Sequence, residues 1–208
     1  MITFSILAGG QSRRMGENKA LKMFMNAPLI NRIIMRVQPL AGEIHVIADQ
    51  PDFFAYLNVP IFQDIRIGSG VLGGVYTAFS CSTLEYVAPV GCDMPFLSAA
   101  LYRSEIDLLE RSGADVVIPE SFKGLEPLHA VYRRKSCLYP VENALLSGEK
   151  KIISWFEQVN VIILSPSEIC SIDPSPHIFF NLNNPDEFQQ AEQIAASIYR
   201  SGSINIPG

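Results

Sequence analysis

The sequence predicts one α/β domain with a doubly wound, mostly parallel sheet, and three observations lead to this class. Apolar strand-like runs alternate with segments whose apolar residues recur at helical spacing. Glycine-rich and polar turns separate these segments, as in chains where helical crossovers join parallel strands. A length of 208 residues, with 48% hydrophobic and 18% charged residues, suits a single filled core. We therefore expect one domain over residues 1–200 and a flexible tail over residues 201–208.

The N-terminal half begins with a strand, a loop and a helix. Ile2–Leu7 is apolar and strand-like, residues 8–17 are rich in glycine and arginine, and Pro28–Leu40 has apolar residues at helical spacing. The elements expected next are a buried strand at Glu43–Ala48, a short helix at Asp52–Leu57, a strand at Pro60–Phe62, a glycine-rich loop at Gly68–Gly74, a helix at Val75–Ser80 and a strand at Tyr86–Val90.

The C-terminal half continues the alternation. Cys92–Leu97 is a turn that leads into a helix at Ser98–Ser112, with Ser98 as its N-cap. We expect Glu126–Tyr132 to be a strand that closes the site from the opposite side of the sheet. The remaining expected elements are strands at Ala114–Pro119 and Val161–Leu164, short helices at Cys137–Leu146 and Lys151–Val159, and a proline-started amphipathic helix at Pro185–Ser197.

The bulk properties limit the classes of partner. A formal net charge of −5 gives little support for general attraction to nucleic acid, so any phosphate site must be local. Cys81, Cys92, Cys137 and Cys170 form no C-x-x-C pair and are expected to be reduced thiols. Ile2–Ala8 lacks the basic flank of a signal peptide, and no apolar run reaches the roughly 18 residues of a membrane helix. We expect a cytoplasmic protein that binds neither nucleic acid nor membrane.

The segment richest in chemistry follows the first expected strand. It reads LAGGQSRRMG from Leu7 to Gly16, with Lys19 shortly after. Glycines let backbone N–H groups approach phosphate oxygens, and arginine and lysine supply the charge that a triphosphate needs. The segment matches neither G-x-G-x-x-G nor the Walker A pattern, so neither a dinucleotide fold nor a P-loop NTPase follows. The alternative is an ordinary glycine turn beside solvated basic residues.

Asp93 is the best candidate for a metal ligand. It lies in Gly91-Cys92-Asp93-Met94-Pro95, at the end of an expected strand, where open α/β sheets bind ligands. A carboxylate held there can bind Mg²⁺, which prefers hard oxygen ligands and often bridges to substrate phosphates. The alternative is an aspartate that only caps the following turn or helix.

Two further segments are candidates for binding. The glycines of Gly68–Gly74, preceded by Asp64, permit close approach of a base or a sugar, and the alternative is a mobile lid or a loop that opens the next helix. Amides also precede the helix that starts at Pro185, where the local pattern by itself favours Asn183 or Asn184 as a simple N-cap. A binding role for Asn181 and Asn183 rests mainly on the resemblance described next.

Taken together, these segments resemble the molybdenum cofactor guanylyltransferase family. The resemblance spans nearly the whole chain. It implies a Rossmann-like, glycosyltransferase-A-like nucleotidyltransferase fold and transfer of GMP from GTP to molybdopterin carrying molybdenum, with Mg²⁺ as cofactor and release of pyrophosphate. Molybdenum insertion proteins and recipient molybdoenzymes are the further partners that it suggests. The resemblance is carried, in this order, by Leu7–Gly10, residues 13–16 with Lys19, Gly70–Gly74, Asp93-Met94-Pro95 and Asn181-Leu182-Asn183.

The resemblance also assigns roles by position, with two departures. An asparagine commonly ends the family's second strand as a nucleotide contact, and this chain has Asp49 there; the family's proline in the middle glycine motif is replaced by Val71. The segment Gly124–Ala130 looks like the family's later substrate-facing strand. The implied site comprises Arg13, Lys19 and Asp93 for catalysis, Leu7, Ala8, Gly9, Gly10, Lys19, Asp49, Asp64, Gly70, Gly74 and Asp93 for the nucleotide, Asn181 and Asn183 for the substrate, and Asp93 for the metal.

Two other functions stay open. A cytidylyltransferase acting on molybdopterin or on a sugar or alcohol phosphate is the nearest, although similar enzymes often carry alanine where this chain has Gly9. A non-catalytic nucleotide-binding module is the second, and the presence of Lys19 and Asp93 argues against it. The three histidines are interpreted as structural or surface groups, because a phosphate nucleophile needs no strong general base.

Overall fold

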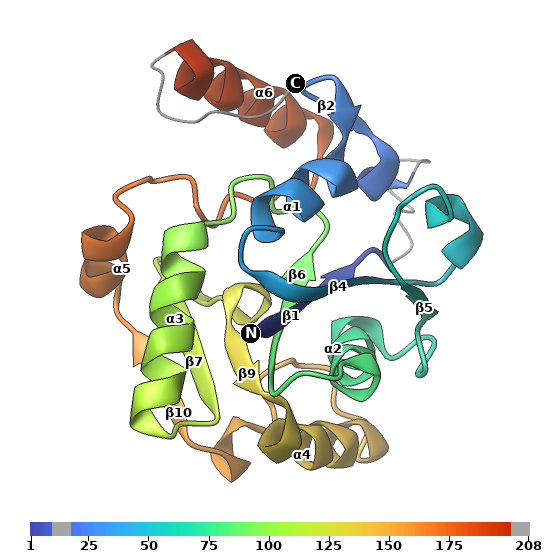
Figure 1. Ribbon diagram of the computed structural model, residues 1–208, viewed down its shortest axis with the longest axis vertical. Helices are drawn as coiled ribbons and strands as arrows, with labels where there is room; N and C mark the ends of the chain where they lie inside the picture. Colours follow the sequence, from blue (N-terminus) through green and yellow to red (C-terminus); the bar gives the residue numbers. More distant parts are fainter. Residues whose placement is uncertain (10–17, 201–208) are drawn as a thin grey trace.

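A mostly parallel sheet forms the centre of the computed structural model, which describes residues 1–9 and 18–200 (Figure 1). β1 pairs in parallel with β4 and β6, whereas β9 is antiparallel to both of its neighbours, β6 and β7. In spatial order the strands are β10 (Val161–Leu164), β7 (Val116–Ser121), β9 (Val131–Arg133), β6 (Tyr86–Gly91), β1 (Ile2–Leu7), β4 (Ala41–Ala48) and β5 (Ile61–Gln63), with β8 (Gly124–Leu125) paired to β7.

Helices cover both faces of this sheet, which confirms the doubly wound arrangement. Successive side chains of a strand point to opposite faces, and the core accordingly divides into two hydrophobic clusters. The first cluster joins β1 to α1, α3, α5 and α6, and the second joins the sheet to α2 and α4. The helices are α1 (Leu29–Val37), α2 (Gly70–Cys81), α3 (Ala99–Ser112), α4 (Arg134–Leu146), α5 (Pro166–Ile172) and α6 (Pro185–Arg200).

The expected ends of α3 are confirmed by its caps. The Ser98 hydroxyl oxygen accepts a hydrogen bond from the Leu101 N–H at 3.1 Å, which satisfies a donor that the helix itself leaves unpaired. The helix stops at Gly113, whose φ of 70° lies in the left-handed region that favours glycine.

The glycine-rich segment is not a loop along its whole length. α2 already begins at Gly70, so the prediction of a loop over Gly68–Gly74 followed by a helix at Val75 is wrong from Gly70 onward. Glycine has low helix propensity, but here packing against the Asp64 loop and β1 outweighs it.

The strand expected over Glu126–Tyr132 is also different. Pro127–His129 forms a 3-10 turn, and only Val131–Arg133 is a strand. This strand lies inside the sheet rather than on the opposite side of the site.

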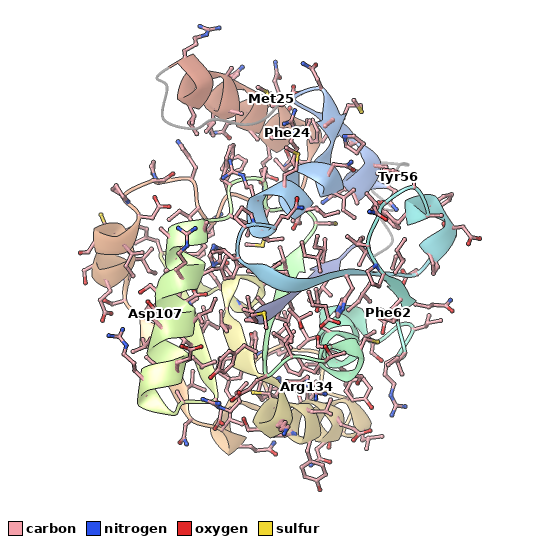
Figure 2. All side chains as sticks on the ribbon, in the orientation of Figure 1. Phe24, Met25, Tyr56, Phe62, Asp107 and Arg134 are labelled. Carbon is pink, nitrogen blue, oxygen red and sulfur yellow. The ribbon has the colours of Figure 1, made fainter. Side chains whose placement is uncertain are left out.

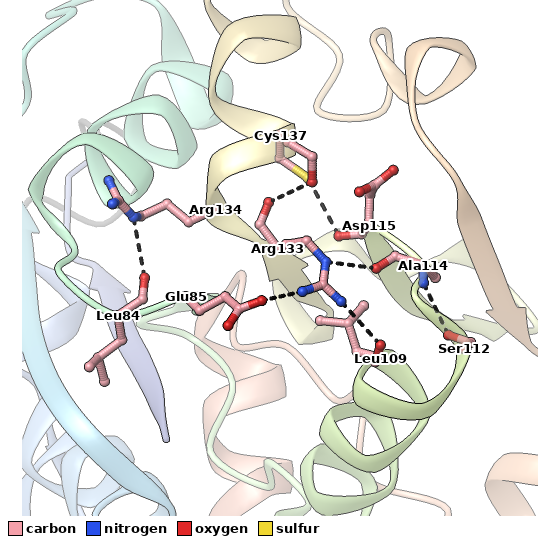
Figure 3. A network of polar contacts seen from close by, with 10 residues as sticks. Leu84, Glu85, Leu109, Ser112, Ala114, Asp115, Arg133, Arg134 and Cys137 are labelled. Atoms are coloured by element: carbon pink, nitrogen blue, oxygen red, sulfur yellow. Dashed lines mark hydrogen bonds and ion pairs between the residues drawn. The ribbon is translucent and has the colours of Figure 1, made fainter.

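Polar contacts anchor the end of β9 between its neighbours (Figure 3). The Arg133 guanidinium donates to the carbonyl oxygens of Ala114 at 3.2 Å and Leu109 at 3.3 Å and pairs with the Glu85 carboxylate. The next residue, Arg134, donates from Nε to the Leu84 carbonyl oxygen at 3.2 Å. These bonds join α3 and the segments before β7 and β6 to the end of β9 and the start of α4.

The remaining differences concern short elements. The helix expected at Asp52–Leu57 is a 3-10 turn at Pro51–Phe54, and the helix expected at Lys151–Val159 is reduced to a 3-10 turn at Phe156–Gln158. Further elements were not expected. They are the hairpin of β2 (Met23–Phe24) and β3 (Ala27–Pro28), β8, α5, and a 3-10 turn at Lys19–Leu21.

All four cysteines are free thiols, as expected. Burial is the main reason that the pKa of Cys92 is raised to about 12. Among the described helices, none combines the length and the apolar character needed to cross a lipid bilayer.

Candidate active site

The carboxyl ends of three parallel strands bring distant segments together. Leu7 is in register with Ile47 on one side and with Gly91 on the other, so β1, β4 and β6 end at the same edge of the sheet. The ladder continues one residue further, because Ala8 N–H donates to the Ile47 carbonyl at 2.8 Å and Cys92 N–H donates to the Leu7 carbonyl at 3.3 Å. The loops that follow these strands therefore start side by side, at the edge where open α/β sheets bind ligands.

Gly9 and Asp49 meet at this edge. A Cβ atom added at Gly9 would lie 3.3 Å from Asp49 Oδ1, so the absence of a side chain at Gly9 leaves room for the carboxylate. Asp49 follows β4 and is exposed. The position that departs from the family's asparagine therefore lies directly beside the expected phosphate loop.

Asp93 lies close to Lys19. Burial raises the pKa of the Asp93 carboxyl above its ordinary value, and the Lys19 ammonium opposes that rise. Gly91 makes this position possible, because a Cβ atom there would lie 2.8 Å from Asp93 Oδ1. The two charged residues expected to act together are thus neighbours, although one precedes the first helix and the other follows β6.

The asparagine segment is bonded to the Asp93 loop. Leu182 N–H donates to the Asp93 carbonyl oxygen at 2.9 Å, and the Leu182 side chain is buried. Asn181 and Asn183 flank this anchor, so the structure brings both expected substrate residues to the segment that carries the metal-ligand candidate. Asn181 Oδ1 is buried and has no hydrogen-bond donor among the described residues.

Glu187 is a functional candidate that the sequence analysis missed. Its Oε2 accepts the Asn183 N–H at 2.5 Å, and its charge contributes to the raised pKa of Asp93. The pattern of Asn184 at the N-cap and Glu187 three residues later is a signal for a helix start that could have drawn attention to it.

Asp64 lies near the site and also holds the loop that follows β5. Its Oδ1 accepts hydrogen bonds from the Thr77 hydroxyl at 2.7 Å and from the Arg66 N–H at 3.0 Å. The other oxygen, Oδ2, would lie 3.4 Å from a Cβ atom at Gly73. Asp64 therefore fastens the segment after β5 onto α2.

The two glycines expected to contact the nucleotide have different structural roles. Gly70 has a φ of 64° and begins α2, with open space around its Cα where a Cβ would be. Gly74 packs against the Leu7 side chain, since a Cβ atom would lie 3.3 Å from Leu7 Cδ1. Gly70 is thus open to a ligand, and Gly74 brings α2 close to β1.

Two expected site residues, Gly10 and Arg13, lie outside the described residues. Their roles stay predictions.

The described residues fit a magnesium ion that is shared with a substrate. The Asp93 carboxylate and the unpartnered, buried Asn181 Oδ1 are hard oxygen donors on segments that are hydrogen-bonded to each other. Over residues 1–9 and 18–200 no group of three or more His, Cys, Asp or Glu side chains could hold a metal ion. A small number of protein ligands is sufficient for Mg²⁺, because this ion commonly binds one or two carboxylates and completes its coordination shell with phosphates and water.

Two of the histidines are structural, as predicted. His45 is buried and its Nε2 lies 2.6 Å from the Ser5 hydroxyl oxygen, and burial lowers its pKa to about 4. His129 is buried beside Glu105, with 3.7 Å between Nδ1 and Oε1, and its ring stacks on Tyr102 at 4.2 Å.

The fold and this edge of the sheet define a class, the open α/β proteins whose ligand sites lie at the carboxyl ends of parallel strands. The family model described as "MobA-like NTP transferase domain" matches residues 4–161. The chain therefore belongs to the MobA-like NTP transferase family.

Curated relatives are similar over nearly their full length. The chain is 33% identical over 195 residues to a probable molybdenum cofactor guanylyltransferase from Carboxydothermus hydrogenoformans, covering 93% of this chain and 96% of that protein. It is also 33% identical over 192 residues to a molybdenum cofactor guanylyltransferase from Desulfosudis oleivorans, covering 92% and 94%.

Solved structures share the fold. The crystal structure of molybdopterin-guanine dinucleotide biosynthesis protein A from Archaeoglobus fulgidus superposes with a TM-score of 0.82 at 25% identity, covering 94% of this chain and 99% of that one. A 4-diphosphocytidyl-2C-methyl-D-erythritol synthase from Anaerococcus prevotii superposes with a TM-score of 0.69 at 12% identity, covering 94% and 98%, and indicates the fold alone. The Rossmann-like nucleotidyltransferase fold is thus confirmed.

Proposed function

We propose that this protein is a magnesium-dependent molybdenum cofactor guanylyltransferase, which transfers GMP from GTP to molybdenum-carrying molybdopterin and releases pyrophosphate. The observation that carries the proposal is the meeting of Lys19, Asp93 and the Asn181–Asn183 segment at the carboxyl edge of the sheet. Relatives at 33% identity named for this activity, aligned over more than nine-tenths of the chain, support it.

In this reaction the terminal phosphate of the pterin substrate attacks the α-phosphorus of GTP, and pyrophosphate leaves in line. A phosphate monoester has a second pKa of about 6, so its oxygens are largely anionic near neutral pH and need no strong general base. The buried histidines have no required role in such a step. Catalysis then depends on positioning and on neutralising charge in the transition state.

Each part of the edge has a task in that scheme. In the loop from Leu7 to Gly10, the N–H groups that follow Ala8 would donate to the triphosphate, because the Ala8 N–H already donates to the Ile47 carbonyl oxygen. Lys19 and Arg13 would balance the charge of the triphosphate, and Asp49, Asp64 and Gly70 would contact the nucleoside. Asn181 and Asn183 hold the acceptor. These roles extend the family resemblance to positions in this chain.

Asp93 would hold the magnesium ion, with Asn181 Oδ1 as the second oxygen that fits it. Mg²⁺ bound there would neutralise charge on the phosphates. The burial that raises the Asp93 pKa makes an uncompensated anion unfavourable at this place, which is a physical reason for a cation beside it. We propose the cytoplasm as the compartment, with molybdenum insertion proteins and recipient molybdoenzymes as further partners.

Calorimetric titration of the purified protein with GTP, CTP, ATP and UTP, with and without Mg²⁺, tests nucleotide choice directly. We expect selective GTP binding that Mg²⁺ strengthens, followed by GTP-dependent pyrophosphate release when molybdenum-loaded molybdopterin is added. Selective CTP binding would replace this proposal with a cytidylyltransferase, and binding of no nucleotide would contradict an enzymatic role.

A further inference from the structure

The turn before α6 is closed by two hydrogen bonds in opposite directions. Asn184 Oδ1 accepts the Glu187 N–H at 2.9 Å, and Glu187 Oε2 accepts the Asn183 N–H at 2.5 Å. The Glu187 carboxylate therefore reaches back past the N-cap residue and holds the backbone of the residue before it. A hydrogen bond from a backbone N–H to an ionised carboxylate is among the stronger ones in proteins.

Both ends of this turn are attached to neighbouring segments. On one side, Leu182 N–H donates to the Asp93 carbonyl at 2.9 Å. On the other, the Phe188 ring packs edge-on against Phe24, with 5.7 Å between the ring centroids, and Lys22 Nζ lies 4.0 Å from the Phe188 centroid. Figure 1 shows α6 beside the hairpin that contains Phe24.

In this arrangement Asn183 lies between two anchored residues of the turn. Leu182 is held by Asp93 and Phe188 by the hairpin, whereas Asn183 is exposed between them. The Asn183 backbone N–H donates a hydrogen bond to Glu187 Oε2. Without this bond the backbone at Asn183 could rotate while both anchors stay in place, and its side chain would turn with it.

We infer that Glu187 is a positioning residue for the acceptor substrate, which acts by fixing the backbone of Asn183 next to the Asp93 loop. The inference rests on the proposed role of Asn183 in holding the acceptor. Glu187 itself need not touch either substrate, and its required property is an oxygen that accepts the Asn183 N–H.

Three variants separate this role from a merely structural one. Glu187→Ala removes the acceptor oxygen, whereas Glu187→Gln keeps an amide oxygen at the same reach and removes the charge. Asp186→Ala is the matched control, because Asp186 is an exposed carboxylate in the same first turn of α6 whose side chain makes no hydrogen bond to the described residues. All three are compared by thermal unfolding, so that a loss of the fold is recognised.

The first readout requires no substrate. Amide hydrogen exchange of Asn183, followed by NMR, is expected to be faster by roughly tenfold in Glu187→Ala and close to wild type in Glu187→Gln and Asp186→Ala. Equal exchange in Glu187→Ala and wild type would overturn the inference whatever the protein's activity is.

The second readout compares the KM for the acceptor substrate with the KM for GTP. Glu187→Ala is expected to raise the KM for molybdenum-loaded molybdopterin by roughly tenfold and to leave the KM for GTP within about twofold, and Glu187→Gln is expected to restore the first value. A Glu187→Gln enzyme as impaired as Glu187→Ala would overturn positioning through the hydrogen bond.

A double-mutant cycle tests whether Glu187 acts through Asn183. In the Asn183→Ala background, Glu187→Ala should no longer raise the KM for molybdenum-loaded molybdopterin, and fully additive effects of the two substitutions on this KM would also overturn the inference. Absence of transfer by the wild-type protein would instead contradict the proposed function, and the exchange experiment would still stand.

Discussion

At the scale of single residues, the site depends on where side chains are missing as much as on where they are present. Gly91 leaves the space into which the Asp93 carboxylate folds, and Gly9 leaves space for Asp49. Burial then makes the Asp93 charge costly, and Lys19 reduces that cost. The chemistry of Asp93 is therefore set by its neighbours in space.

Asp93→Ala is expected to abolish magnesium-dependent turnover while the protein stays folded, because the change removes an oxygen ligand and no large apolar contact. Pyrophosphate release at saturating Mg²⁺ measures turnover, and circular dichroism reports the fold. Asp107→Ala, an exposed aspartate on α3 labelled in Figure 2, is the control and should behave as wild type. Unchanged turnover in Asp93→Ala would remove Asp93 from the mechanism.

Gly91→Ala tests the space beside Asp93 without changing any polar group. The new Cβ atom would lie 2.8 Å from Asp93 Oδ1 and 3.3 Å from Met94 Sδ, so the carboxylate must move. We expect Mg²⁺ affinity and turnover to fall by roughly tenfold or more, whereas GTP binding measured without Mg²⁺ should change little. Wild-type Mg²⁺ affinity in this variant would show that Asp93 tolerates the displacement.

At the scale of elements, α2 begins within a segment whose composition suggests a loop. Gly73 and Gly74 are helical because they bring α2 into close contact with other segments: Gly73 with the Arg66 carbonyl and Ser69, and Gly74 with Leu7. Asp64 is bonded to Thr77 on the same helix. The loop after β5 and the first turns of α2 thus form one packed unit beside the end of β1.

Gly73→Ala should destabilise the protein, in contrast to the usual stabilisation by about 0.5–1 kcal/mol when alanine replaces glycine inside a helix. The added Cβ atom would lie 2.9 Å from Ser69 Cβ and 3.0 Å from the Arg66 carbonyl oxygen, so the loop must shift. Urea unfolding measures the change, which we expect to be about 1–3 kcal/mol. Val71→Ala, at an exposed position in the same turn, is the control. A Gly73→Ala protein more stable than wild type would show that the loop yields without cost.

At the scale of the whole molecule, covering both faces of the sheet buries groups that cannot ionise freely. His45 lies between β1 and the Phe62 ring, with 5.2 Å between ring centroids, and is fully buried. Burial lowers its pKa from 6.5 to about 4, while the nearby Glu43 opposes the shift. The folded protein therefore resists a protonation that the unfolded chain accepts.

This difference gives His45 a contribution to stability that depends on pH. Because the folded pKa lies below the unfolded one, the contribution is fully present above pH 6.5 and is lost as the pH falls toward 4. Between pH 7.5 and 5 the loss is about 2 kcal/mol. Since other buried groups, such as Glu105 with its raised pKa, change the total, the comparison is made against His45→Gln.

Urea unfolding at both pH values should show that wild type loses about 2 kcal/mol more than His45→Gln over this range, whatever the absolute stability of the variant. Ser5→Ala, which removes the hydroxyl 2.6 Å from His45 Nε2 but keeps the imidazole, should retain most of the wild-type pH dependence. Equal pH dependence in wild type and His45→Gln would contradict a depressed pKa.

The sequence by itself determined the strand and helix alternation, the doubly wound fold, the Ser98 cap and the location of Asp93 after β6. These features depend on local residue patterns or on hydrophobic periodicity, and both can be recognised in the sequence without knowledge of long-range contacts. The start of α2 at Gly70 and the antiparallel β9 within the sheet were decided only by the tertiary structure. Both depend on contacts between segments far apart in the chain, and such contacts outweigh the weak local preferences of glycine and of short apolar runs.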